Sequence, residues 1–130
     1  MKVLLDTCAV IWAASRPEGL SPNAREVLQA SDTSVCVSVI TCAEVACLQE
    51  RGRIEILGHW RPWFQQCLSV NRWQALDITL PVVQEAYSLP ETFHRDPADR
   101  LLVGTARVHG LTILTADRRI LDYPHVETRW

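Results

Sequence analysis

Short apolar stretches typical of buried β-strands alternate with helix-like stretches along this chain of 130 residues. Strands that alternate with helices favour a parallel sheet covered on both faces, because each parallel connection needs a crossover. We therefore expect an α/β fold, a three-layer α/β/α sandwich around a central parallel sheet of four to five strands. A chain of this length suits one compact domain, which we expect to span residues 1–130.

The boundaries of these elements follow from local signals. The expected strands cover residues 2–5, 34–37, 73–78 and 112–114, with an edge strand at 125–128. The expected helices cover residues 7–14, 22–31, 39–51, 59–69, 80–89, 97–109 and 118–122. Ser21 and Pro97 mark helix starts, and Pro90, Gly52 and Gly110 mark helix ends. The helix at 97–109 is the best marked, since it has a signal at each end.

Four acidic residues lie where the chain leaves a strand and enters a helix: Asp6, Glu44, Asp99 and Asp117. In an open α/β sheet, ligands bind outside the carboxyl ends of the strands. Acids gathered there repel one another unless a cation neutralises them. The pattern therefore points to a hard divalent ion, Mg²⁺ or Mn²⁺, and to phosphate chemistry.

Each acid also has a purely structural explanation. Asp6 and Asp117 can cap the helices that follow them. Glu44 can close a capping box with Thr41, and Asp96 precedes a proline, which makes it a natural N-cap. Helix caps are usually shared among Ser, Thr, Asn and Asp, whereas here an acid follows nearly every interior strand. The recurrence favours a site over four independent caps.

The charge balance limits how this chain can contact nucleic acid. The formal net charge is −2, and charged residues make up 22% of the chain. A protein that binds nucleic acid through a broad basic surface is usually more basic, so any such contact must use arginines near the acids. Arg95 and Arg100 are the first candidates for holding phosphates, followed by Arg118 and Arg119. Their structural alternative is pairing with the same acids.

Cysteine content and hydropathy indicate in which cellular compartment the protein is expected. The five cysteines are odd in number and form no Cys-x-x-Cys pair, which favours reduced thiols over disulfides or a zinc site. No apolar run approaches the roughly 20 residues that span a bilayer. We expect a cytoplasmic protein without a signal peptide or membrane segment.

Four sequence segments, in this order, carry a resemblance to a known family. They are Leu4-Leu5-Asp6-Thr7, Val37 to Glu44 (VSVITCAE), His94 to Leu102 (HRDPADRLL) and Leu114-Thr115-Ala116-Asp117. With them the chain resembles the PIN-domain ribonucleases, and more narrowly the VapC-type toxins of bacterial toxin–antitoxin pairs. The resemblance implies a PIN-like α/β/α fold, Mg²⁺ or Mn²⁺ as cofactor and cleavage of single-stranded or loop regions of RNA. It also implies homodimers and inhibition by a small cognate antitoxin protein.

The resemblance also assigns site residues. Carried over by position, the family's four acids fall on Asp6, Glu44, Asp99 and Asp117. Asp6 and Asp99 would be the most direct metal ligands, with the other two completing the shell, partly through water. Asp96 competes with Asp99 for the third position; we choose Asp99 and treat Asp96 as a cap or an outer residue. Thr115 resembles the family's common hydroxyl there and would orient a ligand or water.

These assignments predict metal-dependent hydrolysis of an RNA phosphodiester, with Glu44 or Asp117 orienting or deprotonating the attacking water. The family resemblance implies products with 5′-phosphate and 3′-hydroxyl ends. The alternative is a catalytically degenerate PIN module that binds RNA or protein without cleavage. The complete set of four acids argues against that alternative.

Overall fold

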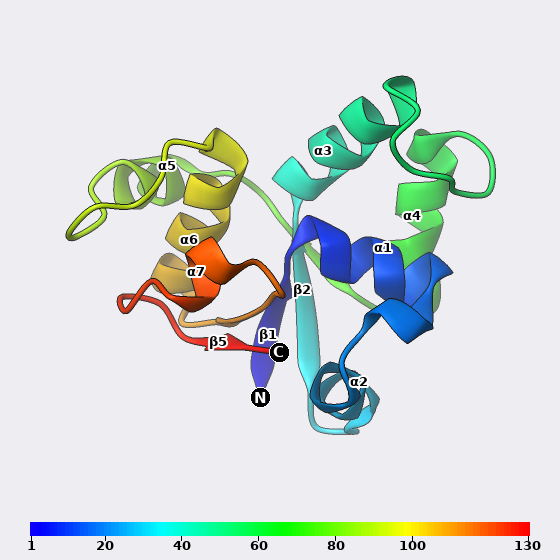
Figure 1. Cartoon of the computed structure of the whole chain (residues 1–130), viewed down its shortest axis with the longest axis horizontal. Coiled ribbons are helices and arrows are strands. Elements are labelled where there is room, and N and C mark those ends of the chain that lie inside the picture. The colour runs from blue at the N-terminus through cyan, green and yellow to red at the C-terminus, as the bar shows by residue number, and fades with distance from the viewer.

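The computed structural model describes all residues, 1–130, as a five-stranded parallel sheet with helices on both faces (Figure 1). The strands are β1 (Lys2–Leu5), β2 (Ser34–Ser38), β3 (Gln74–Leu76), β4 (Thr112–Leu114) and β5 (Thr128–Arg129). Their order across the sheet is β3-β2-β1-β4-β5. The predicted α/β fold with a central parallel sheet is confirmed.

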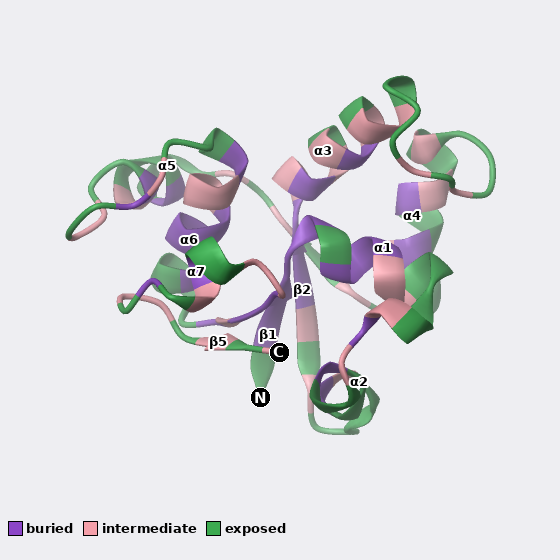
Figure 2. Cartoon of the chain, viewed as in Figure 1, coloured by how far each residue is buried: buried purple, intermediate pink, exposed green.

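The central strand β1 is apolar on both faces, as a covered parallel strand must be. Val3 and Leu5 point into one hydrophobic core, and Leu4 between them points into a second. Each core continues through the neighbouring strands, because pairing of β1 with β2 and β4 keeps residues of the same face side by side. In Figure 2, β1 is buried along most of its length between the two helical layers.

Helices from the first half of the chain cover one face of the sheet. They are α1 (Thr7–Ser15), a 3₁₀ turn at Pro17–Gly19, α2 (Pro22–Gln29) and α4 (Trp60–Asn71). These helices contribute Ala9, Val10, Ala24, Val27 and Phe64 to the first core, and Leu20, between the 3₁₀ turn and α2, joins them. α3 (Val39–Glu50) continues directly from β2 and lies beyond the end of the sheet, in contact with α1, α4 and α6 (Figure 1).

Helices from the second half cover the opposite face. They are α5 (Leu80–Ala86), α6 (Pro97–His109) and α7 (Arg118–Leu121). α6 contributes Leu102, Val103 and Ala106 to the second core, and α5 packs on α6. No helix of the structure is long and apolar enough to cross a membrane.

Most predicted boundaries are confirmed within one or two residues, including α6 and its left-handed stop at Gly110, where φ is 65°. Three predictions need correction. The strand expected at 73–78 covers only Gln74–Leu76, and the helix expected at 80–89 ends at Ala86. The edge strand expected at 125–128 is present, but it covers Thr128–Arg129, through which β5 pairs with β4.

The strand order creates a switch point at the middle of the sheet. From β1 the chain moves to β2 and β3 on one side, and then returns to β4 and β5 on the other. At such a point the crossovers diverge and leave a crevice outside the carboxyl ends of the strands. Asp6 follows β1, and Thr115 and Asp117 follow β4, so the topology brings residues from both ends of the chain to one place.

Gly104 allows the close contact of α6 with α5. A Cβ atom at this position would lie 2.8 Å from the Val82 carbonyl oxygen and 2.9 Å from the Ala86 nitrogen. Gly104→Ala is expected to lower the free energy of unfolding by about 1–3 kcal/mol, although alanine is the better helix former. Urea unfolding followed by circular dichroism measures the change. Val108→Ala, at an exposed position of the same helix, should stay within about 0.5 kcal/mol of the unsubstituted protein; equal effects of the two changes would contradict this packing.

Candidate active site

An acidic pocket of about 370 Å³ lies at the carboxyl edge of the sheet. Its lining includes all four acids expected from the sequence, together with the contested fifth: Asp6, Glu44, Asp96, Asp99 and Asp117. The only basic residue that lines it is Arg119. Side chains 111 positions apart in the sequence therefore share one cavity that carries five carboxylates.

Asp6 is buried, with 7% of its surface exposed, and it serves two structures at once. Its Oδ1 accepts a hydrogen bond from the Ala9 backbone N–H at 2.8 Å, which caps α1. Its Oδ2 accepts from the Thr115 hydroxyl at 2.5 Å, and Thr115 Oγ1 in turn accepts from the Asp117 N–H at 3.0 Å. Thr115 thus links Asp6, which follows β1, to the backbone of Asp117, which follows β4.

Glu44 lies inside α3, whose N-cap is Ser38. Its carboxylate accepts a hydrogen bond from the Thr7 hydroxyl. The capping-box alternative with Thr41 is therefore wrong, since Ser38 caps the helix and Glu44 points to α1. The partnership of Thr7 with Glu44 was missed from the sequence. No local sequence signal gave it: the contact depends on the pairing of β1 with β2, which sets Leu5 beside Val37 and brings the two following helices together.

Asp96 and Asp99 differ in what their carboxylates contact. Asp96 is exposed and caps α6, with Oδ1 accepting from the Ala98 and Asp99 N–H groups at 2.9 and 3.3 Å. The Asp99 side chain is only 14% exposed, and its Oδ2 lies 3.0 Å from His94 Nε2 and 3.6 Å from an Arg119 nitrogen. Asp96 is a cap, as the sequence indicated. The geometry favours Asp99 as the inner acid.

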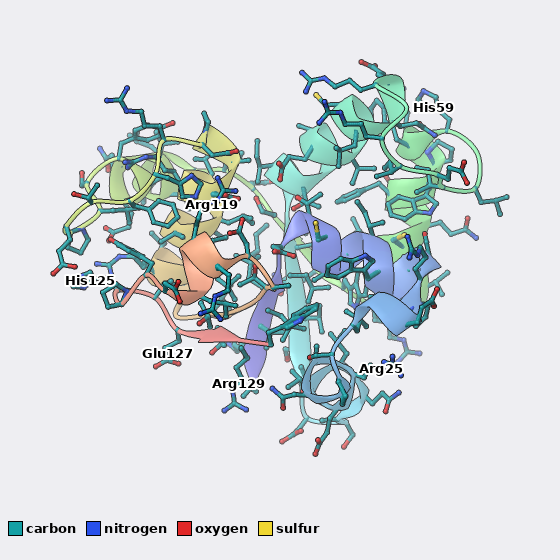
Figure 3. All side chains as sticks on the ribbon, viewed as in Figure 1. Arg25, His59, Arg119, His125, Glu127 and Arg129 are labelled. Atoms are coloured by element: carbon teal, nitrogen blue, oxygen red, sulfur yellow. The ribbon has the colours of Figure 1, made fainter.

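Asp117 caps α7, where its Oδ1 accepts from the Arg119 N–H at 2.9 Å. The Arg119 guanidinium also contacts both Asp117 oxygens, at 3.3 Å through Nε and 3.0 Å through a terminal nitrogen. Hydrogen bonding to Arg119 holds the pKa of Asp117 below its usual value. Figure 3 labels Arg119 where α6 and α7 lie next to each other.

The other inner acids have raised pKa values. Burial raises the pKa of Asp99 to about 7, with further contributions from the charges of Asp96, Asp117 and Glu44. Burial likewise raises the pKa of Asp6 and of Glu44, although hydrogen bonds from the threonines oppose the shift. The carboxylates of the pocket therefore carry more negative charge than Arg119, its only basic side chain, neutralises.

This donor set fits a hard divalent cation. Carboxylate oxygens are the ligands that Mg²⁺ and Mn²⁺ prefer, and an added cation would relieve the repulsion that raises these pKa values. As the side chains stand, each inner acid is held by a partner within the chain. No group of three or more His, Cys, Asp or Glu side chains is close enough together to enclose an ion.

Two arginines that were predicted to hold phosphates, Arg95 and Arg100, do not line the pocket. Arg100 donates to the Ala86 and Phe93 carbonyl oxygens at 3.1 and 2.9 Å, so it ties the end of α5 and the following loop to α6. Arg95 is exposed and makes no ion pair. Of the two later candidates, Arg119 lines the pocket, whereas Arg118 pairs with Asp122 at 3.5 Å.

A second pocket, of about 680 Å³, lies between α1, α4 and the loop that precedes α4. It is mostly apolar, with Trp63, Leu57 and Val70 among its lining residues and Glu55 as the only charged one. It lacks the grouped titratable side chains that chemistry needs. The acidic pocket is therefore the candidate active site, although it is smaller.

Comparison with known proteins places this chain beside characterised relatives. The family model described as PIN domain matches residues 3–126. Ribonuclease VapC22 from Mycobacterium tuberculosis is 36% identical over 123 residues, which cover 95% of this chain and 92% of that protein.

Solved structures show the same fold. The crystal structure of VapBC2 from Rickettsia felis, bound to a DNA fragment from its promoter, aligns over 99% of this chain and 98% of the matched chain with a TM-score of 0.74 and 17% identity. DNA-bound VapBC from Salmonella typhimurium aligns over 99% and 97% with a TM-score of 0.65 and 20% identity.

Proposed function

This chain belongs to the PIN domain family, and we propose that it is a ribonuclease that hydrolyses RNA with Mg²⁺ or Mn²⁺ and acts as the toxin of a toxin–antitoxin pair. The observation that carries the proposal is the pocket in which Asp6, Glu44, Asp99 and Asp117 meet at the switch point of the sheet. Its support from relatives is the similarity to Ribonuclease VapC22 along nearly the whole chain. The complete acid set argues against a binding module without activity.

In this proposal Asp6 and Asp99 are the most direct ligands, and Glu44 and Asp117 complete the shell, partly through water. An ion held there supplies polarisation of a phosphate oxygen and a lowered pKa for a bound water. Thr115 orients the carboxylate of Asp6, and Thr7 orients that of Glu44.

Glu44 is the better candidate for orienting or deprotonating the attacking water. Burial raises its pKa, and a raised pKa makes a carboxylate a stronger base. As the side chains stand, Asp117 is bound by Arg119 through both carboxylate oxygens, and this contact lowers the pKa of Asp117.

We propose two protein partners. One is a small cognate antitoxin, in line with the VapBC complexes among the structural neighbours, and the apolar pocket beside α1 and α4 offers it a surface. The other is a second copy of this chain, as the family resemblance implies. The five free cysteines suit the reducing cytoplasm, where the RNA substrate would be met.

Controlled expression in a bacterial host, followed by sequencing of RNA ends, tests the substrate. The chain is expected to produce discrete new 5′-phosphate ends in single-stranded or loop regions within minutes of induction. Cells that express Asp6→Ala at the same level should lack these ends. New ends that persist with Asp6→Ala, or no new ends with the unsubstituted chain, would contradict the proposal.

A further inference from the structure

Arg119 bridges two acids of the pocket that belong to different helices. Its terminal nitrogen lies 3.0 Å from Asp117 Oδ2 on α7 and 3.6 Å from Asp99 Oδ2 on α6. No other basic side chain lines the pocket. One guanidinium therefore provides the positive charge that faces five carboxylates.

The contacts of Arg119 with Asp99 and Asp117 can be broken without disturbing other parts of the fold. The Arg119 side chain is 60% exposed, whereas those of Asp99 and Asp117 are 14% and 28% exposed, so the arginine covers the carboxylates from the solvent side. Its guanidinium contacts no group other than these two acids. Because most of the Arg119 side chain is in contact with water, solvation of the freed guanidinium offsets part of the free energy lost when it leaves.

The same carboxylate oxygens are the ones a divalent ion would need. A cation of higher charge on Asp99 and Asp117 would repel the guanidinium and take its place. The displaced side chain stays attached to α7 beside the pocket. Its planar, permanently charged head suits phosphate oxygens, and a phosphate entering an acidic pocket needs such a partner.

We propose that Arg119 is an exchangeable cation of this site: it holds Asp99 and Asp117 while no divalent ion is bound, gives way to the ion, and then binds the phosphate of the RNA being cleaved. This role rests on the proposed metal-dependent ribonuclease function. Arg118 provides a matched contrast, because it is 80% exposed and its partner is Asp122.

The test is a calorimetric titration of Mn²⁺ into the metal-free full chain and its Arg119→Gln, Arg119→Lys and Arg118→Gln variants. Arg119→Gln is expected to bind Mn²⁺ about three- to tenfold more tightly, because a competing cation is gone. Arg119→Lys should stay near the unsubstituted affinity, since it keeps the charge. Arg118→Gln should stay within about twofold, because its charge lies outside the contact.

Cleavage of a labelled single-stranded RNA at saturating Mn²⁺ gives the second readout. Arg119→Gln is expected to lower kcat/KM about tenfold or more, since a charge-assisted contact with phosphate is lost. Tighter metal binding combined with weaker turnover is a pairing that a merely structural role would not produce. Arg118→Gln should keep kcat/KM.

The outcomes separate this role from the function on which it rests. If the unsubstituted chain binds Mn²⁺ and cleaves RNA while Arg119→Gln shows unchanged metal affinity or unchanged kcat/KM, the role of Arg119 is wrong and the function stands. If the unsubstituted chain neither binds Mn²⁺ nor cleaves RNA, the proposed function fails, and the role of Arg119 fails with it.

Discussion

Asp6→Asn is expected to lower RNA cleavage by about a thousandfold or more, because losing charge stabilisation by a bound cation costs several kcal/mol and each 1.4 kcal/mol is tenfold in rate. Asparagine keeps the volume of the side chain and an oxygen that can accept from the Ala9 N–H. The Thr115 hydroxyl can accept from the new amide group. The change therefore removes the charge while the cap of α1 remains.

Initial rates with a fluorescent single-stranded RNA measure this loss, and thermal unfolding shows that the variant is folded. Asp122→Asn is the matched control, because Asp122 is an exposed acid whose ion-pair partner is Arg118. It should cleave at the unsubstituted rate. Similar rates for the two variants would show that the charge of Asp6 has no part in the chemistry.

The metal-free protein is expected to become less stable as pH rises from 5 to 8. The folded chain holds the pKa of Asp99 at about 7, against 3.8 for the ordinary side chain. Between these values the folded state binds more protons than the unfolded state, so the free energy of unfolding falls as pH rises. Asp99 alone accounts for a loss of about 2–3 kcal/mol over this range. The raised pKa values of Asp6 and Glu44 act in the same direction, whereas the lowered pKa of His94, which contacts Asp99, acts against it.

Urea unfolding in the presence of EDTA at several pH values measures this dependence. The side chain of Asp99→Asn is uncharged at every pH. This variant should therefore show a smaller change in the free energy of unfolding between pH 5 and 8, and it should be more stable than the unsubstituted chain at pH 8. Asp122→Asn should keep the slope, because Asp122 is exposed. An unsubstituted chain that is more stable at pH 8 than at pH 5 would contradict the raised pKa of Asp99.

The elements that the sequence defined best were those with chemical signals at their ends. α6 begins at Pro97, after the Asp96 cap, and ends before Gly110, where a left-handed turn favours glycine. α5 lacked such a signal at its true end. Its last carbonyl, at Ala86, accepts a hydrogen bond from Arg100, fourteen residues later. A tertiary contact of this kind leaves no trace in local spacing.

The last strand was misplaced for a related reason. Thr128 and Arg129 show no apolar alternation, and they become a strand only because β4 offers a free edge for pairing. Whether a short polar segment reaches such an edge depends on the packing of the residues before it.

For the site, the sequence predicted which acids would meet but not what would hold them. Asp6 and Asp117 follow the adjacent strands β1 and β4 as the strand-end pattern predicted, whereas Asp99 follows no strand and reaches the pocket because α6 packs across that face of the sheet. The arginines depended on side-chain direction. Arg100 is closer in sequence to Asp99 than Arg119 is, yet it turns toward Ala86 while Arg119 reaches the acids. The structural and functional explanations of the acids also proved compatible, because Asp6 and Asp117 cap helices and line the pocket at once.

The central claim is that acids at one edge of the sheet make this chain a ribonuclease that depends on a divalent ion. Metal add-back tests it most directly: the purified chain is stripped with EDTA, dialysed and assayed on labelled single-stranded RNA with and without Mn²⁺. We predict no cleavage without metal and restored cleavage with Mn²⁺, yielding 5′-phosphate and 3′-hydroxyl ends. Undiminished cleavage by the stripped chain, or no cleavage at any Mn²⁺ concentration, would contradict the claim.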